Sequence, residues 1–485
     1  MVQDEAAASA SSSVISSPLQ FFSSMSISPG SPYTPWVQEL KSDERGLYLI
    51  HLLLNCANHV AAGSLDQANS CLEQISMLAS PTGDTMQRIA SHFTEALARR
   101  VLRSWPGLYR SLNLTTTGIA DSLAARRHFF DLCPFIKVAC LICNQAIMEA
   151  MEGEKVVHII DLHTIDPIQW VALLQALRQR PEGPPHLRIT GISDHKELLD
   201  VTGARLCEEA EKLDIPFQFH PVLAKVENLD VESLRVKTGE AVAVCSLFQL
   251  HCLLASDDDI GNGFRKFHSS PSPAATHSNN KNTVQLHKIM QLTQGTLGEL
   301  LEKDIMANAK NAYSPDSASS PFALAPSPKM ERFLASVWSL TPKVMLVTEQ
   351  ESNHNGATVN ERFVEALNFY AALFDCLEST VPRISPERMK VEKMMFGEEI
   401  KNIIACEGGE RKERHEKLDK WVQRLDIAGF CRVPLSYLPL LQADRFLQSY
   451  GCDGYKLKEE NGYIQICWQD RALFSVSAWR CRRFE

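Results

Sequence analysis

A stretch from Val156 to Trp170 constrains what this chain can fold into more than any other feature of its sequence. Val156–Asp161 is a short apolar run that ends in an acid, and Pro167 stands at the first turn of the helix expected after it. A strand, turn and helix of this form open a nucleotide-binding, doubly wound fold. The turn holds no glycine, because His163 and Pro167 stand where glycines would be expected.

The missing glycines bear directly on cofactor binding. A dinucleotide or S-adenosylmethionine site needs glycines at this turn, so that the backbone can bend sharply and approach the ligand. Here side chains would fill that space, and Asp166 adds a negative charge. We therefore expect no cofactor. The alternative is a divergent S-adenosylmethionine-dependent methyltransferase that uses Asp161 and Asp194, or a regulator that binds another small ligand in an apolar pocket.

Further apolar runs predict a mostly parallel sheet covered on both faces. The predicted strands are Val156–Asp161, Leu187–Ile192, Phe217–Val222, Ala241–Leu247 and Lys343–Gln350, and helical patterns follow most of them. Two later runs, Tyr463–Gln469 and Leu473–Trp479, are separated by only a few residues, which favours an antiparallel hairpin. The expected fold class is α/β, with a Rossmann-like, methyltransferase-related sheet that ends in this hairpin.

The segments before the first strand are helical by their apolar periodicity, and Phe129–Met151 is expected to be one long helix. We expect an N-terminal helical cap over 43–151 and an α/β core over 152–485. Ser, Ala and Pro dominate residues 1–42, which favours a disordered arm. The Ser-, Pro- and Asn-rich stretches near 256–283 and 313–329 are typical of mobile insertions.

Charge and cysteine content restrict the possible environments and partners. The formal net charge is −9, so no broad basic face is expected, and contact with DNA would be indirect. Fourteen cysteines are scattered without a framework, which favours free thiols in a reducing compartment. The sequence shows neither a signal peptide nor an apolar stretch close to the ~20 residues of a membrane span. We expect an intracellular protein without membrane contact.

Other candidate sites are weak. Cys140 and Cys143 form one C-x-x-C without a second pair, and no H-E-x-x-H pattern occurs, so no metal site is expected. Leu49, Leu52 and Leu53 form an L-x-x-L-L that could contact a partner, although such a stripe more often faces the protein's own core. Arg411–Lys420 alternates in charge and is expected to be a solvated helix face.

Several motifs in order along the chain resemble those of the plant GRAS family of transcriptional regulators. The first is a V-H-I-I-D strand with Gln-Trp at a fixed distance: Val157, His158, Ile159, Ile160, Asp161, Gln169 and Trp170. The later ones are Pro342, Phe369 and Tyr370, then Trp421 and Trp468, and finally Ser477, Ala478 and Trp479. Details such as Arg188–Gly191 and Phe396–Ile400 are closest to a scarecrow-like branch of that family. The resemblance covers about residues 43–485.

The resemblance implies a helical cap on a Rossmann-like core and a nuclear, non-enzymatic co-regulator. It also implies partners: DNA-binding zinc-finger factors, DELLA and other GRAS proteins, with homo- or heterodimers among them. The processes implied are gibberellin signalling, growth and root development. The chain departs from the family at His163 and Pro167, where many members keep glycines, and at Glu398, where many have Arg. The first departure weakens the case for a small ligand.

Overall fold

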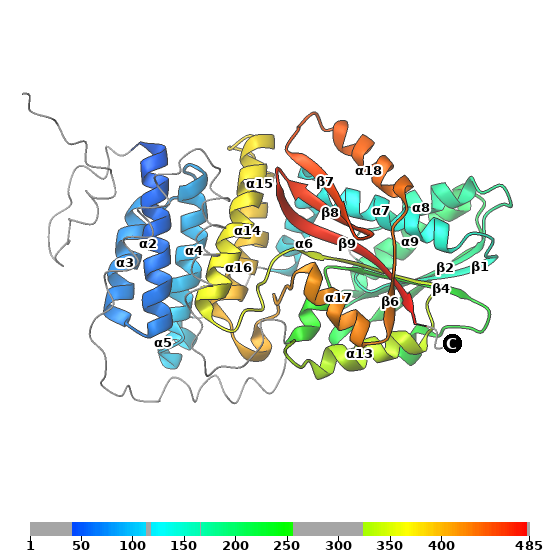
Figure 1. The fold of residues 1–485 in the computed structure, drawn as a ribbon, viewed down its shortest axis with the longest axis horizontal. Helices are drawn as coiled ribbons and strands as arrows, with labels where there is room; N and C mark the ends of the chain where they lie inside the picture. Colours follow the sequence, from blue (N-terminus) through cyan, green and yellow to red (C-terminus); the bar gives the residue numbers. More distant parts are fainter. Residues whose placement is uncertain (1–40, 113–117, 165, 256–323, 483–485) are drawn as a thin grey trace, which may run out of the picture.

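The computed structural model describes residues 41–112, 118–164, 166–255 and 324–482. A helical bundle lies beside an α/β part that contains the sheet, and both are visible in Figure 1. The expected disordered arm falls outside the described residues except for 41 and 42. The insertion expected near 256–283 falls outside them too, as does most of the one near 313–329, where a helix already begins at Pro328.

The predicted parallel strands are all present. They are β1 (Val156–Asp161), β2 (His186–Ser193), β3 (Phe217–Leu223), β4 (Ala241–Leu247) and β5 (Val344–Gln350). Their order in the sheet is β3-β2-β1-β4-β5, and each neighbouring pair is parallel. The chain thus reverses its direction of growth across the sheet after β3, as a doubly wound fold requires. The predicted fold class is confirmed.

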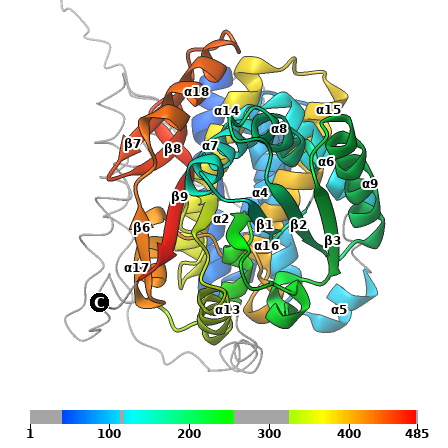
Figure 2. The same cartoon turned by 90° about the vertical axis from the view of Figure 1, so that its right-hand side faces the viewer.

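Alternating side chains of these strands enter two separate apolar cores, which is why the strands are almost continuously apolar. Ile159 of β1 belongs to the core shared with the bundle, whereas Ile160 belongs to the core on the opposite face. The helices around the sheet are α7 (Phe135–Ala150), α8 (Ile168–Arg178), α9 (Lys196–Lys212), α13 (Pro328–Ser339), α17 (Leu418–Ile427) and α18 (Tyr437–Gln448). Figure 2 shows them around the strands.

The antiparallel end of the sheet is larger than predicted. The expected hairpin is present as β8 (Tyr463–Trp468) and β9 (Arg471–Cys481), and β9 lies between β5 and β8. Two further strands, β6 (Phe430–Val433) and β7 (Tyr455–Glu460), were not predicted. β7 and β8 are joined by Asn461 and Gly462, with φ of 54° and 81°. An Asn-Gly pair is the usual two-residue hairpin turn, because both positions need a positive φ.

The helical cap is drawn from two separate parts of the chain. Its first part comprises α2 (Ser42–Ala62), α3 (Leu65–Leu78), α4 (Thr85–Leu102), α5 (Pro106–Ser111) and α6 (Ile119–Leu132). Its second part comprises α14 (Val359–Thr380), α15 (Pro386–Val391) and α16 (Gly397–Ala405), which pack on α2, α4 and α6. The cap therefore differs from the expected single segment 43–151, because the apolar faces of α14 and α16 complete its core.

The prediction of one helix over Phe129–Met151 is wrong. α6 ends at Leu132 and α7 begins at Phe135, with a 79° bend between them. Pro134 explains the break, because its ring lacks an amide donor and disfavours a helical residue before it. Among the described helices, none is by itself both long and apolar enough to cross a membrane. The bent α6–α7 pair meets those criteria only when its two helices are taken together.

Short irregular helices complete the described chain. The 3-10 helices are η2 (Val226–Asn228), η3 (Val231–Leu234), η4 (Leu250–Leu254) and η6 (Gly408–Glu410), and η5 (Glu392–Phe396) is π-helical. Within η5, Glu392 accepts hydrogen bonds from Arg388 at 2.8 Å and from the Nε of Arg88 at 2.7 Å. All three side chains are buried, so this pair of bonds fixes the second part of the cap onto α4.

Candidate functional site

Asp161, at the carboxyl end of β1, holds the following turn together from inside. Its Oδ2 accepts hydrogen bonds from the Thr164 hydroxyl and from Trp170 Nε1, both at 2.9 Å, and its Oδ1 accepts one from the His163 amide at 3.2 Å. Burial raises the pKa of Asp161, and these three hydrogen bonds oppose the rise. Donors from the following turn and helix thus satisfy both oxygens of the carboxylate, so its observed contacts are structural.

His158 is likewise engaged within the sheet. Its ring is fully buried, with Nε2 at 2.8 Å from the Thr190 hydroxyl and Nδ1 at 3.0 Å from a Glu240 carboxylate oxygen. Burial, with the nearby Arg188 guanidinium, lowers the pKa of His158 to about 4. A neutral ring therefore links β1 to β2 and to the start of β4.

Side chains occupy the space beside the glycine-free turn. A Cβ added at Gly191 would lie 2.7 Å from both the Phe219 ring and the Thr164 hydroxyl, so this glycine exists to admit those two groups. Asp194, the alternative ribose acid, is exposed and lies 3.4 Å from Lys225 and 3.2 Å from His195 Nε2. Among the described residues, neither acid lines the apolar groove that lies between α7, α8 and α18.

The other motif residues are also core residues. Phe369, Tyr370, Trp421, Trp468, Ala478 and Trp479 are at most 3% exposed, and Ser477 is 2% exposed. Three of them anchor polar atoms: Tyr370 donates to Glu399 at 2.7 Å, Trp468 to Asp375 at 2.7 Å, and Trp479 to Ser477 at 2.9 Å. Pro342 is buried just before β5. These side chains build the fold and do not form one site.

The L-x-x-L-L residues lie in the core of the cap. Leu49, Leu52 and Leu53 on α2 are 0%, 5% and 0% exposed. A partner could reach them only if the helices of the bundle separated. The structure thus places these leucines where the alternative interpretation put them, against the protein's own core, and not on a contact surface.

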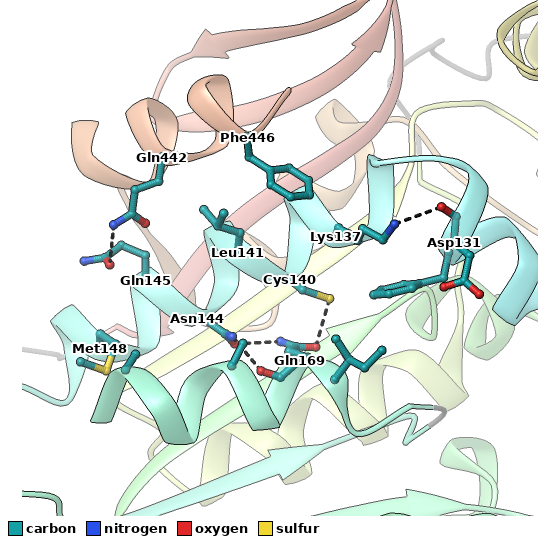
Figure 3. Close-up of a pocket in the computed structure, with 14 residues that line it drawn as sticks. Asp131, Lys137, Cys140, Leu141, Asn144, Gln145, Met148, Gln169, Gln442 and Phe446 are labelled. Atoms are coloured by element: carbon teal, nitrogen blue, oxygen red, sulfur yellow. Dashed lines mark hydrogen bonds between the residues drawn. The ribbon is translucent and has the colours of Figure 1, made fainter. Parts of the chain in front are cut away.

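A groove of about 530 Å³ lies between α7, α8 and α18, and Figure 3 shows its lining. Most of the lining is apolar, with Leu141 and Met148 from α7 and Phe446 from α18. Its polar groups are held in place: Asn144 Nδ2 donates to the Gln169 carbonyl at 2.8 Å, and Cys140 donates to the Gln169 side chain at 3.4 Å. Gln169 is therefore a motif residue that lines this groove.

One end of the groove carries opposite charges. Lys137 Nζ donates to the Asp131 carbonyl at 3.1 Å and to the Tyr450 hydroxyl at 2.9 Å, and the Asp131 carboxylate is exposed beside it. At the other end Gln442 of α18 donates to Gln145 of α7 at 3.4 Å. An apolar floor with polar ends suits an amphipathic element more than a small charged metabolite.

The prediction for Arg411–Lys420 is wrong. The segment is largely irregular until α17 begins at Leu418, and Arg411, Arg414, His415 and Glu416 are at most 6% exposed. The alternating charges find partners inside the protein, as when Glu416 accepts from Arg424 Nε at 2.6 Å. Charge alternation alone does not distinguish a solvated face from a buried network, because both need opposite charges close together.

This segment meets the carboxyl ends of β4 and β5 in a polar cluster that the sequence analysis missed. His251 follows β4, Glu349 lies in β5, and Glu413 and His415 come from the buried segment. Burial lowers the pKa of His415 well below its usual value, whereas the partners of His251, Cys252 and Glu349 first among them, raise its pKa despite burial. The E-x-H spacing of Glu413 and His415 was the only local signal, since His251 lies far away in the sequence.

All fourteen cysteines are free thiols, as predicted. Cys140 and Cys143, the isolated C-x-x-C, are buried on α7. Cys140 contacts Gln169, and Cys143 lies 3.8 Å from the Thr348 hydroxyl on β5. Cys143 thus packs between α7 and the sheet, whereas Cys140 faces α8 and lines the groove.

Comparison with known proteins places this fold in a family. The GRAS domain family model matches residues 49–480. The chain is 58% identical to Scarecrow-like protein 3 of Arabidopsis thaliana, over 97% of this chain and 98% of that protein. It is 33% identical to DELLA protein GAI1 of Vitis vinifera, over 90% of this chain and 62% of that protein.

A solved structure agrees with these sequence matches. The crystal structure of SCL7 from Oryza sativa is 30% identical, covers 89% of this chain and 99% of its own, and superposes with a TM-score of 0.67. The family match spans nearly all of the described helices and strands. The chain therefore belongs to the GRAS family of plant transcriptional regulators, in which it is similar to Scarecrow-like protein 3.

Proposed function

We propose that this protein is a non-enzymatic, nuclear co-regulator that is recruited to promoters by a DNA-binding zinc-finger factor. The observation that carries the proposal is the apolar groove between α7, α8 and α18. GRAS-family transcriptional regulators are generally nuclear, which supports the compartment. The net charge of −9 supports a division of labour in which the partner, and not this chain, contacts DNA phosphates.

The shape of the groove suits the helix of such a partner. A zinc finger presents one helix on a small ββα unit, and an amphipathic helix binds a groove through apolar residues spaced three and four apart. Leu141, Met148 and Phe446 would contact those residues. Asp131 at the rim would attract the basic residues that a DNA-binding module carries.

A second surface supports contacts with DELLA and other GRAS proteins. Trp105, Leu108 and Leu112, which lie in or directly beside the short helix α5, are 45–48% exposed. Exposed aromatic and aliphatic side chains that cluster in this way are typical of protein contacts, and Trp is a frequent hot spot. DELLA and SCARECROW proteins among the relatives support a role in gibberellin signalling, growth and root development. Dimers with GRAS partners, this chain included, would use this surface.

Blocking the groove tests the proposal. Ala172 is an exposed groove residue on α8, so Ala172→Arg should fill the cavity without disturbing the core. Ala204→Arg on the exposed face of α9 is the matched control. We expect affinity purification from the native plant tissue to lose zinc-finger factors with Ala172→Arg and to retain them with Ala204→Arg. The same co-purified factors from both variants would contradict the proposal, as would tight, sequence-specific promoter binding by the purified protein alone.

Titration calorimetry with S-adenosylmethionine tests the enzymatic alternative. The saturated Asp161 and the exposed Asp194 support an expectation of no measurable heat. Micromolar binding that is abolished by Asp194→Ala would favour a divergent methyltransferase instead. Binding that survives Asp194→Ala would point to a different ligand site.

A further inference from the structure

A second group of side chains meets at the edge of the sheet where the parallel strands end. The imidazole nitrogens of His251 and His415 and a Glu413 carboxylate oxygen all lie within 4.8 Å of one another. We propose that these three residues bind one Zn²⁺ ion, with the two histidines coordinating through Nε2. The site is independent of the proposed groove, and neither the family match nor the relatives' names assign it.

The distances from the carboxylate to the two histidines fit a tetrahedral zinc ion. Glu413 Oε2 lies 3.3 Å from His251 Nε2 and 3.3 Å from His415 Nε2. With zinc–ligand bonds of about 2.0–2.1 Å, two ligands at the tetrahedral angle lie about 3.3 Å apart. Two nitrogens and one carboxylate oxygen are a zinc ligand set, whereas calcium and magnesium prefer oxygen ligands alone.

Glu349 orients the first histidine. It lies 2.9 Å from His251 Nδ1, and its other oxygen accepts the Leu250 amide at 2.8 Å. A carboxylate that holds Nδ1–H leaves the lone pair of Nε2 directed toward the metal, which is the usual arrangement around a zinc-bound histidine. Glu349 is 1% exposed, so this orientation is fixed by the core of β5.

A chain of polar groups orients the second histidine. His415 Nδ1 lies 2.9 Å from His354 Nδ1, and His354 Nε2 lies 2.8 Å from the Ser352 hydroxyl. His415 is 0% exposed, and its Nε2 is buried without a hydrogen-bond partner among the described atoms. A buried polar atom without a partner needs an explanation, and a metal ion at this position supplies one.

The partly exposed Glu413 gives the ion a route into the site. One coordination position of the ion stays open. The Glu413 side chain is 18% exposed, whereas those of His251 and His415 are 5% and 0% exposed. Three protein ligands leave the fourth tetrahedral position for water. A bound ion would fasten the segment that carries Glu413 and His415 to the end of β4, and metal binding would then stabilise the folded protein.

Metal titration of the full chain tests the proposal. The purified protein is stripped with a chelator and titrated with Zn²⁺ by calorimetry and with Co²⁺ by visible absorption. We expect one ion per chain, cobalt bands without thiolate charge-transfer absorption, and a higher melting temperature with zinc. Glu413→Gln keeps the shape of the partly exposed ligand and should weaken affinity at least about 100-fold, and Glu349→Gln about 10–100-fold.

Two comparisons keep the test decisive. Cys207→Ser is the control, because this thiol is exposed on α9 and is not among the three proposed ligands. It should bind zinc as the unmodified chain does. His251→Gln, checked for folding by circular dichroism, gives a second ligand variant. No binding at all, thiolate absorption with cobalt, or unchanged affinity in Glu413→Gln would each overturn the site.

Discussion

The two halves of the sheet's carboxyl edge use polar residues in opposite ways. At β1, Asp161 is satisfied by donors from its own turn, and its partner Trp170 is 1% exposed. At β4 and β5, His251 pairs both with Glu349 and with Glu413, which lies more than sixty positions beyond Glu349 along the chain. The recognisable sequence motif thus marks the half at β1, where the polar groups have a structural role. The half at β4 and β5, which contains the proposed metal ligands, has no compact motif. A sequence motif can therefore reflect the requirements of folding more than those of a chemical activity.

Trp170→Ala should have the largest effect and tests the half at β1. The ring is buried in the core, and its loss leaves a cavity and removes a donor from Asp161, so we expect a loss of about 3–5 kcal/mol in unfolding free energy. Urea denaturation followed by circular dichroism measures it. Trp105→Ala, at a 45% exposed position, is the control and should change stability by no more than about 0.5 kcal/mol. Equal effects in the two variants would remove the structural distinction.

Glu349→Gln tests the charged half with little change in shape. The substitution removes the charge that His251 and the Leu250 amide contact, and we expect the metal-free protein to lose about 1.5–3 kcal/mol of unfolding free energy. Glu208→Gln on the exposed face of α9 is the matched control. If Glu349→Gln were as stable as Glu208→Gln, the cluster would contribute no charge-dependent stability, and the two halves of the edge would be alike.

A pH series on His158→Gln should give the most specific effect, because the effect develops only as the pH falls below about 6.5. The folded-state pKa of His158 is lowered to about 4 by burial and by Arg188, against an ordinary value of 6.5. The unfolded chain therefore binds a proton that the folded chain does not, and stability falls as the pH drops from about 6.5 to 4. The slope is up to about 1.4 kcal/mol per pH unit. The substitution should flatten it; parallel pH profiles for both proteins would show that His158 does not titrate in this way.

The sheet was the most predictable part of the molecule. Parallel strands covered on both faces are continuous apolar runs, and all five were found within one residue of their predicted bounds or slightly longer. β6 and β7 were not predicted because they are only partly buried and combine apolar with polar residues, such as Lys456 and Lys458 in β7. The Asn461-Gly462 pair was a usable hairpin signal for β7.

The polar clusters were the least predictable part. Which charged residues become buried depends on contacts between distant segments, such as His251 with Glu413, and local periodicity carries no information about such contacts. The same limit explains why the second part of the cap was not predicted, because no local pattern in α14 or α16 indicates that they pack against α2 and α4. The missing glycines argued against a cofactor at the turn after Asp161, but they did not show what this carboxylate does. Its structural role, which depends on the hydrogen bond from Trp170, required the structure.

The position of β9 has a consequence for how the protein is made. β9 is formed by Arg471–Cys481 and pairs with β5, β6 and β8. Because β9 is the last of the described strands to be synthesised, these three strands lack this pairing partner until the end of translation. While the chain emerges from the ribosome, the edge of β5 stays open, and open edges recruit other strands. A message truncated just before this strand would therefore yield an aggregation-prone polypeptide that depends on chaperones, and not a shortened regulator.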